Sequence, residues 1–149
     1  MRLSRRNVLL GLGGAALGAA GVYAATSLPE APIRATLTPT EMRDALVKGQ
    51  IMVVDIRRPD EWASTGIAQG AIPIDMRRED FLDALLAARP TETMPIAIIC
   101  ARGVRSRRLS NVLIRAGVSP IIDIPEGMIG SRAGPGYIKA GLPVTPWTG

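Results

Sequence analysis

Short apolar runs alternate along the chain with segments in which apolar residues recur every three or four positions. Residues 51–56 and 96–99 are continuous apolar runs rich in β-branched side chains, which is typical of buried strands in a parallel sheet. Residues 81–86 instead place leucine and phenylalanine at helical spacing. Strands are predicted over residues 34–37, 51–56, 71–74, 96–99 and 120–124. Helices are predicted over residues 38–47, 81–86 and 106–117, and a short helix is predicted to begin at residue 59. This alternation predicts a three-layer α/β/α sandwich around a five-stranded, mainly parallel sheet.

Two local signals refine these elements. Thr38 and Glu41 have the spacing of a capping box, and Pro39 between them suits the first position of a helix. Pro73 has no N–H group to donate to a neighbouring strand, so its strand is predicted at the edge of the sheet.

The first 25 residues have the pattern of an export signal. Three arginines in the first six positions precede a stretch without charge that is rich in apolar residues. Residues 4–10 resemble a twin-arginine signal, in which the Arg5–Arg6 pair is read by a receptor. We expect residues 1–25 to be a signal peptide, 26–33 a linker and 34–149 one domain of a periplasmic protein.

The same segment has a second interpretation, an uncleaved membrane anchor. Residues 8–25 are somewhat shorter than the about 20 residues that a membrane-spanning helix needs. Several glycines within them weaken helicity and hydrophobicity, which favours a cleaved signal, and Ala24 offers a small residue before Ala25. Membrane contact is expected only if this segment is retained.

The charge of the chain is concentrated at its beginning. Of 18 basic residues, three lie in the first six positions, so the chain from Thr26 onward has 15 basic and 13 acidic side chains, a net charge of +2. A protein that binds nucleic acid needs a large basic face. No nucleic-acid partner is therefore expected.

The absence of histidine and the presence of one cysteine narrow the chemistry further. Without histidine, the chain lacks the commonest general base and the commonest metal ligand. A single cysteine forms neither an intrachain disulfide nor a cysteine metal cluster, and a lone cysteine in an exported protein is a candidate reactive thiol. No metal or cofactor is expected.

Cys100 occupies a position where ligands bind in parallel α/β folds. It follows a predicted central strand, and a helix is expected from Ser106, so the thiol lies at the carboxyl end of the sheet. The N–H groups at the helix start, together with Arg102 and Arg105, favour a thiolate over a thiol. Gly103 lets the loop turn its amides inward. The alternative is a buried structural cysteine, but such a residue requires neither the glycine nor the two arginines.

Four segments resemble the motifs of the rhodanese family in the correct order. Residues 100–106 are similar to its active loop, Cys-x-x-Gly-x-Arg-Ser, and residues 54–62 to its Asp-x-Arg segment followed by Glu and an aromatic residue. Residues 66–71 resemble its Gly-His-Ile-Pro-Gly-Ala motif, and residues 141–144 its Gly-x-Pro-Val ending. The resemblance spans about residues 37–144.

The resemblance implies a sulfurtransferase that needs no cofactor. Cys100 would take sulfur from a small anionic donor such as thiosulfate, carry it as a persulfide, and pass it to a thiol, a protein thiol or cyanide. The loop residues that would bind the substrate are Ala101, Arg102, Gly103, Val104, Arg105 and Ser106. For Arg105, a second role is a bridge to a carboxylate of the scaffold. Asp55 and Arg57 are expected to form a structural ion pair rather than an acid–base pair.

The sequence departs from the family pattern at several positions. Ile67 and Gln69 replace a usual His and Pro in a mostly structural motif, and Tyr137 stands where Trp is usual. The glycine-rich stretch 127–136 is long, and it could line the pocket and alter the acceptor.

Three other functions remain open at this point. Cysteine phosphatases and arsenate reductases separate Cys and Arg by five residues, whereas four residues separate Cys100 from Arg105 here. The second alternative function is a non-enzymatic module that binds a partner. A sulfur carrier in a periplasmic relay, with a protein thiol as acceptor, is the third.

Overall fold

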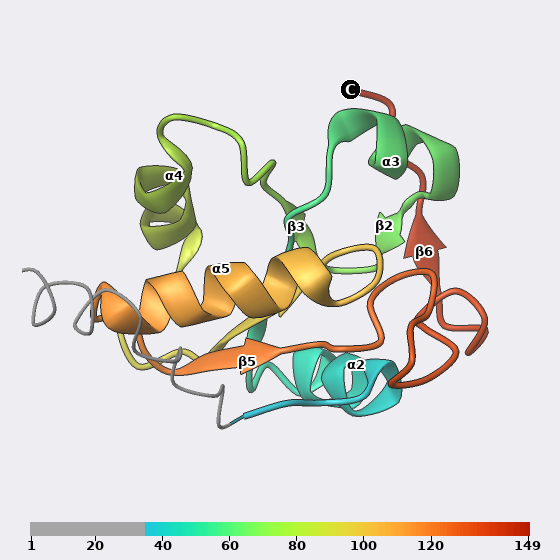
Figure 1. The fold of residues 1–149 in the computed structure, drawn as a ribbon, viewed down its shortest axis with the longest axis horizontal. Helices are drawn as coiled ribbons and strands as arrows, with labels where there is room; N and C mark the ends of the chain where they lie inside the picture. Colours follow the sequence, from blue (N-terminus) through green and yellow to red (C-terminus); the bar gives the residue numbers. More distant parts are fainter. Residues whose placement is uncertain (1–34) are drawn as a thin grey trace, which may run out of the picture. The chain divides into compact units, whose positions relative to one another are not determined.

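The computed structural model describes residues 35–149 (Figure 1). The predicted signal peptide, the linker and Arg34 lie outside the described residues. The helices are α2 (Pro39–Val47), α3 (Pro59–Thr65), α4 (Phe81–Ala88) and α5 (Val104–Arg115). The strands are β1 (Met52–Asp55), β2 (Ile67–Ala68), β3 (Ile72–Pro73), β4 (Ile96–Ile99), β5 (Ile121–Asp123) and β6 (Val144–Thr145).

The central sheet is parallel and has the order β3-β1-β4-β5. The predicted α/β class is confirmed, and β3, with Pro73, lies at the edge as expected. The first predicted strand is reduced to a single parallel bridge between Thr36 and Asp123 beside β5. The parallel sheet therefore has four strands among the described residues, and the prediction of five strands is wrong.

The sheet separates two buried clusters because side chains alternate along its strands. Val54 packs with Leu85 of α4 and Leu113 of α5 on one face, whereas Val53 packs with Met42 of α2 on the other. Helices therefore cover both faces, and the predicted three layers are confirmed (Figure 1). In residues 35–149, no helix combines the length and the apolar character that crossing a membrane requires.

The predicted capping box forms at the start of α2. The Thr38 hydroxyl accepts the Glu41 N–H at 3.3 Å, and the Glu41 carboxylate accepts the Thr38 N–H at 2.8 Å. Pro39 occupies the first helical turn, as the spacing predicts.

A second, two-stranded sheet connects distant parts of the chain. β2 and β6 run antiparallel, with Ile67 opposite Thr145 and Ala68 opposite Val144. This pairing brings together two of the family-like motifs, the one at residues 66–71 and the one at residues 141–144. The sequence does not reveal it because strands of two residues leave no detectable alternation.

Candidate active site

Cys100 directly follows the central strand β4. Asp55 pairs in register with Ile99, so β1 and β4 end together and bring Asp55 beside the residue that precedes the thiol. Cys100 is 1% exposed, and it contributes to one wall of a pocket that opens at this edge of the sheet. The chain thus places its single thiol at the carboxyl end of a parallel sheet, where ligands bind in this type of fold.

Backbone N–H groups converge on the Cys100 Sγ atom. The Gly103 N–H donates to Sγ at 3.2 Å and the Ser106 N–H donates at 3.4 Å. The Ser106 Oγ atom lies 3.6 Å from Sγ, and its hydroxyl donates to the Gly103 carbonyl at 3.2 Å. Two amide dipoles thus point their positive ends at the sulfur, which favours negative charge there.

Helix α5 begins at Val104, two residues before the predicted start at Ser106, so that prediction is wrong. Gly103 adopts a left-handed conformation with φ +80°, and it reverses the chain so sharply that the helix starts at the next residue. The Arg107 N–H then donates to the Gly103 carbonyl. Ser106 consequently lies in the first turn, which explains why its N–H is free to reach the sulfur.

Three further N–H groups of the loop have no acceptor within residues 35–149. They belong to Arg102, Val104 and Arg105. All three residues contribute to the pocket wall beside Cys100. Unpaired N–H groups at a helix start form a site for an anion, so the loop offers further donors to an anion beside Cys100.

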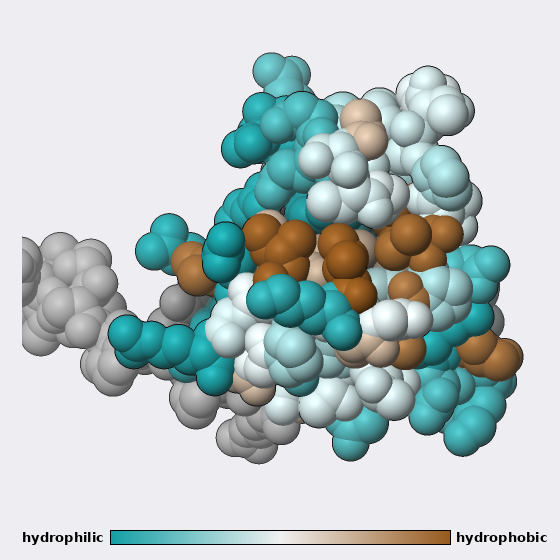
Figure 2. Space-filling model, turned by 90° about the vertical axis from the view of Figure 1, so that its right-hand side faces the viewer, coloured by the Kyte–Doolittle hydropathy of each residue, from teal (hydrophilic) through white to brown (hydrophobic). Residues whose placement is uncertain are grey.

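The pocket has a volume of about 330 Å³ and combines polar and apolar walls. Val104 and Ile129 supply apolar surface and are 59% and 37% exposed. On the face of the molecule that includes the start of α5, hydrophobic residues gather in a band bordered by hydrophilic ones (Figure 2). The opening is thus largely apolar, with charge supplied by Arg102, Arg105 and Glu61.

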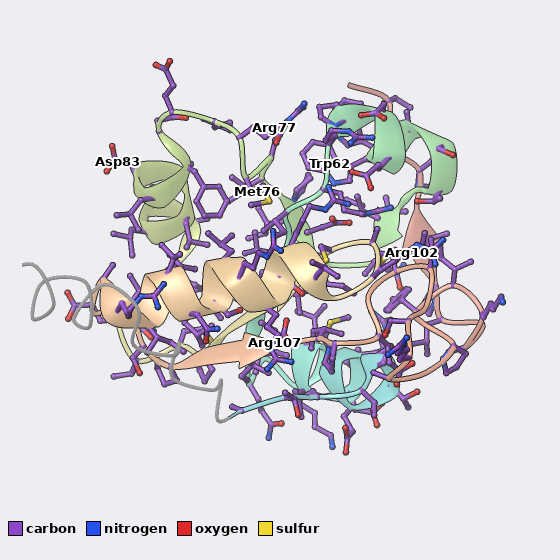
Figure 3. The ribbon with its side chains drawn as sticks, in the orientation of Figure 1. Trp62, Met76, Arg77, Asp83, Arg102 and Arg107 are labelled. Atoms are coloured by element: carbon purple, nitrogen blue, oxygen red, sulfur yellow. The ribbon has the colours of Figure 1, made fainter. Side chains whose placement is uncertain are left out.

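The Arg105 guanidinium binds a carboxylate of the scaffold. Its two terminal nitrogens donate to the two Glu61 oxygens at 2.6 and 2.8 Å. This pairing lowers the pKa of Glu61, mainly through the side-chain hydrogen bond from Arg105. Of the two roles considered for Arg105, the structure supports the bridge, which links α5 to α3. Arg102 is exposed and forms no ion pair within the described residues, and it also borders the pocket (Figure 3).

Asp55 and Arg57 form a buried, bidentate ion pair. The Arg57 Nη2 and Nε atoms donate to Asp55, with a shortest distance of 2.8 Å, and both side chains are at most 1% exposed. Arg57 also donates to the Thr65 hydroxyl and the Gly66 carbonyl, both at 2.8 Å. These bonds tie the end of β1 to the end of α3. No hydrogen bond joins the pair to the thiol among the described residues, and its structural role stays a prediction.

The glycine-rich stretch 127–136 lies directly on the active loop. The Met128 N–H donates to the Cys100 carbonyl at 2.8 Å, and the Ile129 N–H donates to the Ala101 carbonyl at 3.0 Å. A Cβ atom on Gly127 would collide with the Ala101 carbonyl. Ile129 lines the pocket, as expected for this stretch. The hydrogen bonds between the backbone of the stretch and the loop after β4 were not predicted.

Two further residues were missed by the sequence analysis. Glu61 was quoted only as part of a motif, because its partner is 44 positions away. Asp123 ends β5, is 2% exposed, and its Oδ1 atom has no hydrogen-bond partner among the described residues. Burial raises the pKa of the Asp123 carboxyl. Within residues 35–149, no group of three or more acidic or cysteine side chains could hold a metal ion.

Comparison with known proteins identifies the fold and a distant curated relative. A family model described as Rhodanese-like domain matches residues 38–130. A tRNA uridine(34) hydroxylase of Chlamydia muridarum (strain MoPn / Nigg) is 27% identical over 111 residues, a match that covers 71% of this chain and 34% of that protein. The chain thus spans about a third of the length of the curated relatives it matches.

Two solved structures share the fold at low sequence identity. The polysulfide-sulfur transferase homodimer of Wolinella succinogenes has a TM-score of 0.60 and 22% identity, over 87% of this chain and 88% of that chain. A Rhodopseudomonas palustris protein of unknown function, described as a possible tyrosine phosphatase, has a TM-score of 0.56 and 22% identity, over 74% and 84%. The family match covers more than half of the chain and includes the loop around Cys100. The chain therefore belongs to the rhodanese-like domain family.

Proposed function

We propose that this protein is a sulfurtransferase that carries sulfane sulfur as a persulfide on Cys100. The donor is a small anion such as thiosulfate, and the acceptor is a thiol or cyanide. Membership of the rhodanese-like family supports sulfur transfer as the general chemistry. The observation that carries the proposal is the pair of N–H groups, from Gly103 and Ser106, aimed at the Cys100 sulfur.

The first half-reaction is a displacement on sulfur. The Cys100 thiolate attacks the outer sulfur of thiosulfate, the sulfur–sulfur bond of the donor breaks, and its electron pair leaves with sulfite. The product is a Cys100 persulfide anion, so charge and atoms balance without an external oxidant. The N–H groups of Arg102, Val104 and Arg105 have no acceptor within residues 35–149, and all three residues line the pocket, so these groups are available to bind the added sulfur.

Arg102 is the side chain best placed to attract the donor. It borders the pocket and has no carboxylate partner within residues 35–149, whereas Arg105 is held by Glu61. A free guanidinium at the opening raises the local concentration of anions and can bind one directly.

Mass spectrometry of the intact protein tests the proposal. Incubation with thiosulfate should add about 32 Da, the mass of one sulfur atom in a persulfide, and cyanide or dithiothreitol should remove it. Cys100→Ser should abolish the addition. Arg102→Ala should lower the second-order rate of loading at least about tenfold, because a hydrogen bond to a charged group contributes about 1.5–3 kcal/mol. Arg108→Ala removes an exposed arginine of α5 that is not among the residues lining the pocket, and it is the matched control. An unchanged mass with every donor would contradict sulfur transfer.

The arrangement of Arg105 argues against a phosphatase. Both of its terminal nitrogens donate to Glu61, so neither is directed at a tetrahedral oxyanion beside Cys100. We therefore expect no phosphate-ester hydrolysis that depends on Cys100. A sulfur carrier that passes its persulfide to a protein thiol uses the same first half-reaction, and it differs only in the acceptor.

The cellular location is a separate proposal that is based on the sequence. We propose that the twin-arginine-type segment directs export to the periplasm and that residues 1–25 are removed. The tRNA substrate in the name of the curated relatives is not extended to this chain, which corresponds to about a third of their length.

A further inference from the structure

A second pocket adjoins the one that contains the thiol. Its volume is about 420 Å³, and it is lined by Arg102, Lys139 and residues of the stretch 129–135. Arg102 and Ile129 border both pockets, so one molecule can extend from the first into the second. Figure 3 places Arg102 between the loop before α5 and the loops that follow β5. A single sulfur atom, sulfite or cyanide needs none of this additional space.

The charge of the second pocket favours an anion. Arg102 and Lys139 are exposed, and neither forms an ion pair within residues 35–149. The carboxylate closest to this stretch in the sequence, Glu126, is 8% exposed and accepts the Gly136 N–H at 2.9 Å. Arg102 and Lys139 therefore line the pocket without an ion-pair partner in residues 35–149, while the Glu126 carboxylate accepts a backbone N–H.

The stretch that forms this pocket is held in a fixed shape. Ser131 and Gly134 exchange backbone hydrogen bonds, and the Ser131 hydroxyl donates to the Pro125 carbonyl at 2.8 Å. Gly134 packs on the Glu126 carboxylate so closely that a Cβ atom would lie 2.5 Å from its Cδ atom. A pocket that exists before a ligand arrives loses less conformational entropy on binding.

We infer that the sulfur acceptor is a thiol that carries a carboxylate, and that this carboxylate binds between Arg102 and Lys139. The inference rests on the proposed function, because the thiol end must reach a persulfide on Cys100. The acceptor sulfur enters the first pocket while the rest of the molecule occupies the second. Thiosulfate fills the first pocket alone, so Lys139 acts in sulfur release and not in loading.

The second half-reaction balances without another reagent. The acceptor sulfur forms a bond with the outer sulfur of the Cys100 persulfide anion, and the inner sulfur–sulfur bond breaks. Its electron pair stays on Cys100 as the thiolate, and the proton of the acceptor thiol ends on the transferred sulfur. A persulfide of the acceptor and a regenerated Cys100 thiolate are the products.

Lys139→Gln provides the test, because the chain has only one other lysine and it supplies a matched control. Lys48 is exposed at the end of α2 and borders neither pocket. Protein loaded from thiosulfate and freed of donor is mixed with mercaptosuccinate or with the uncharged 3-mercaptopropane-1,2-diol. The loss of the added sulfur is followed by intact mass, and rates are expressed per thiolate.

We expect wild-type protein to discharge about tenfold faster to mercaptosuccinate than to the uncharged thiol, as a charge-assisted hydrogen bond requires. Lys139→Gln should reduce this preference about fivefold, Lys139→Arg should retain it, and Lys48→Gln should leave it unchanged. Added salt should weaken the preference in the wild type, because the cations are exposed. Loading from thiosulfate should be the same in all variants.

Two results would overturn the inference while leaving the proposed function intact. One is normal loading followed by discharge that shows no preference for the carboxylate thiol. The other is a Lys139→Gln variant that loads more slowly but discharges with the wild-type preference, which would assign the second pocket to the donor. A wild-type protein that gains no sulfur from any donor would overturn the proposed function and this inference together.

Discussion

At the scale of single residues, the active loop depends on a position that tolerates no side chain. Gly103 has φ +80°, and a Cβ atom there would collide with the Pro125 carbonyl. The same residue donates its N–H to Cys100 and starts α5. Position 103 therefore requires glycine for two reasons: its left-handed backbone conformation and the close approach of the segment after β5.

Gly103→Ala should lower both stability and sulfur loading. Gly117 is a matched control, because it also has a positive φ, +86°, but a Cβ atom there meets nothing within 4 Å. Both substitutions carry the cost of a left-handed alanine, about 1–2 kcal/mol. Only Gly103→Ala adds the collision, so its free energy of unfolding should fall further and its loading rate should drop. Urea unfolding and intact-mass kinetics measure both. Equal effects at the two positions would refute the requirement for close packing.

At the scale of elements, the site is assembled from helices that are distant in the sequence. The first turn of α5 supplies the Ser106 N–H, and α3 supplies Glu61, which holds Arg105. Arg57 in turn ties the end of α3 to β1. The position of α5 beside the thiol is thus supported by one ion pair to α3, and α3 is supported by a second, buried pair.

A double-mutant cycle on Arg105 and Glu61 should give a coupling energy of about 1 kcal/mol, after allowance for solvent screening of this partly exposed pair. The cycle cancels the separate hydrogen bond between Glu61 and the Arg58 N–H. The exposed pair Arg78–Asp80 is the control and should show no measurable coupling. Urea unfolding of the single and double alanine variants measures both energies. A coupling at Arg105 no larger than at the control would remove this support for α5.

The same coupling should depend on pH in a defined direction. The pKa of Glu61 is lowered in the folded protein, mainly by Arg105, so the folded state favours the carboxylate. The contribution should be complete above the pKa of the unfolded state, which is about 4.5. It should be lost as the pH falls through the lowered value in the folded state.

At the scale of the whole molecule, the parallel sheet brings the ends of β1 and β4 and the loop after β5 to the same side, the carboxyl end of the strands. The two faces of the sheet are covered by helices, so the loops at this edge provide the accessible surface around the thiol. The segment after β5 then completes the pocket by hydrogen bonding to the carbonyls of Cys100 and Ala101. This domain is proposed to follow an export signal.

Replacing Arg5 and Arg6 together by lysine should prevent export, because a receptor reads the arginine pair and not its charge alone. Arg2→Lys, outside the pair, should leave export unchanged. Cell fractionation measures the distribution, and mass spectrometry of the exported chain should show a mature N-terminus near Ala25. An exported chain that begins at Met1 would show instead that the segment is retained.

The sequence alone determined the features that depend on neighbouring residues. Apolar runs and helical spacing identified the α/β class, Thr38 and Glu41 identified a helix start, and the loop after β4 identified Cys100 as the candidate nucleophile. These signals lie within a few positions of one another, so local propensity and spacing are enough to read them. The early start of α5 escaped notice because the conformation of Gly103 depends on its packing against Pro125.

Only the tertiary structure decided which distant residues surround the thiol. The choice of Glu61 as the partner of Arg105, the burial of Asp123, and the closeness of Ile129 to the loop all arise from contacts between separate segments. Such contacts result from the packing of the sheet and helices as a whole, which no local pattern encodes. The sequence therefore identified the candidate nucleophile, and the fold decided the shape and charge of the pocket in front of it.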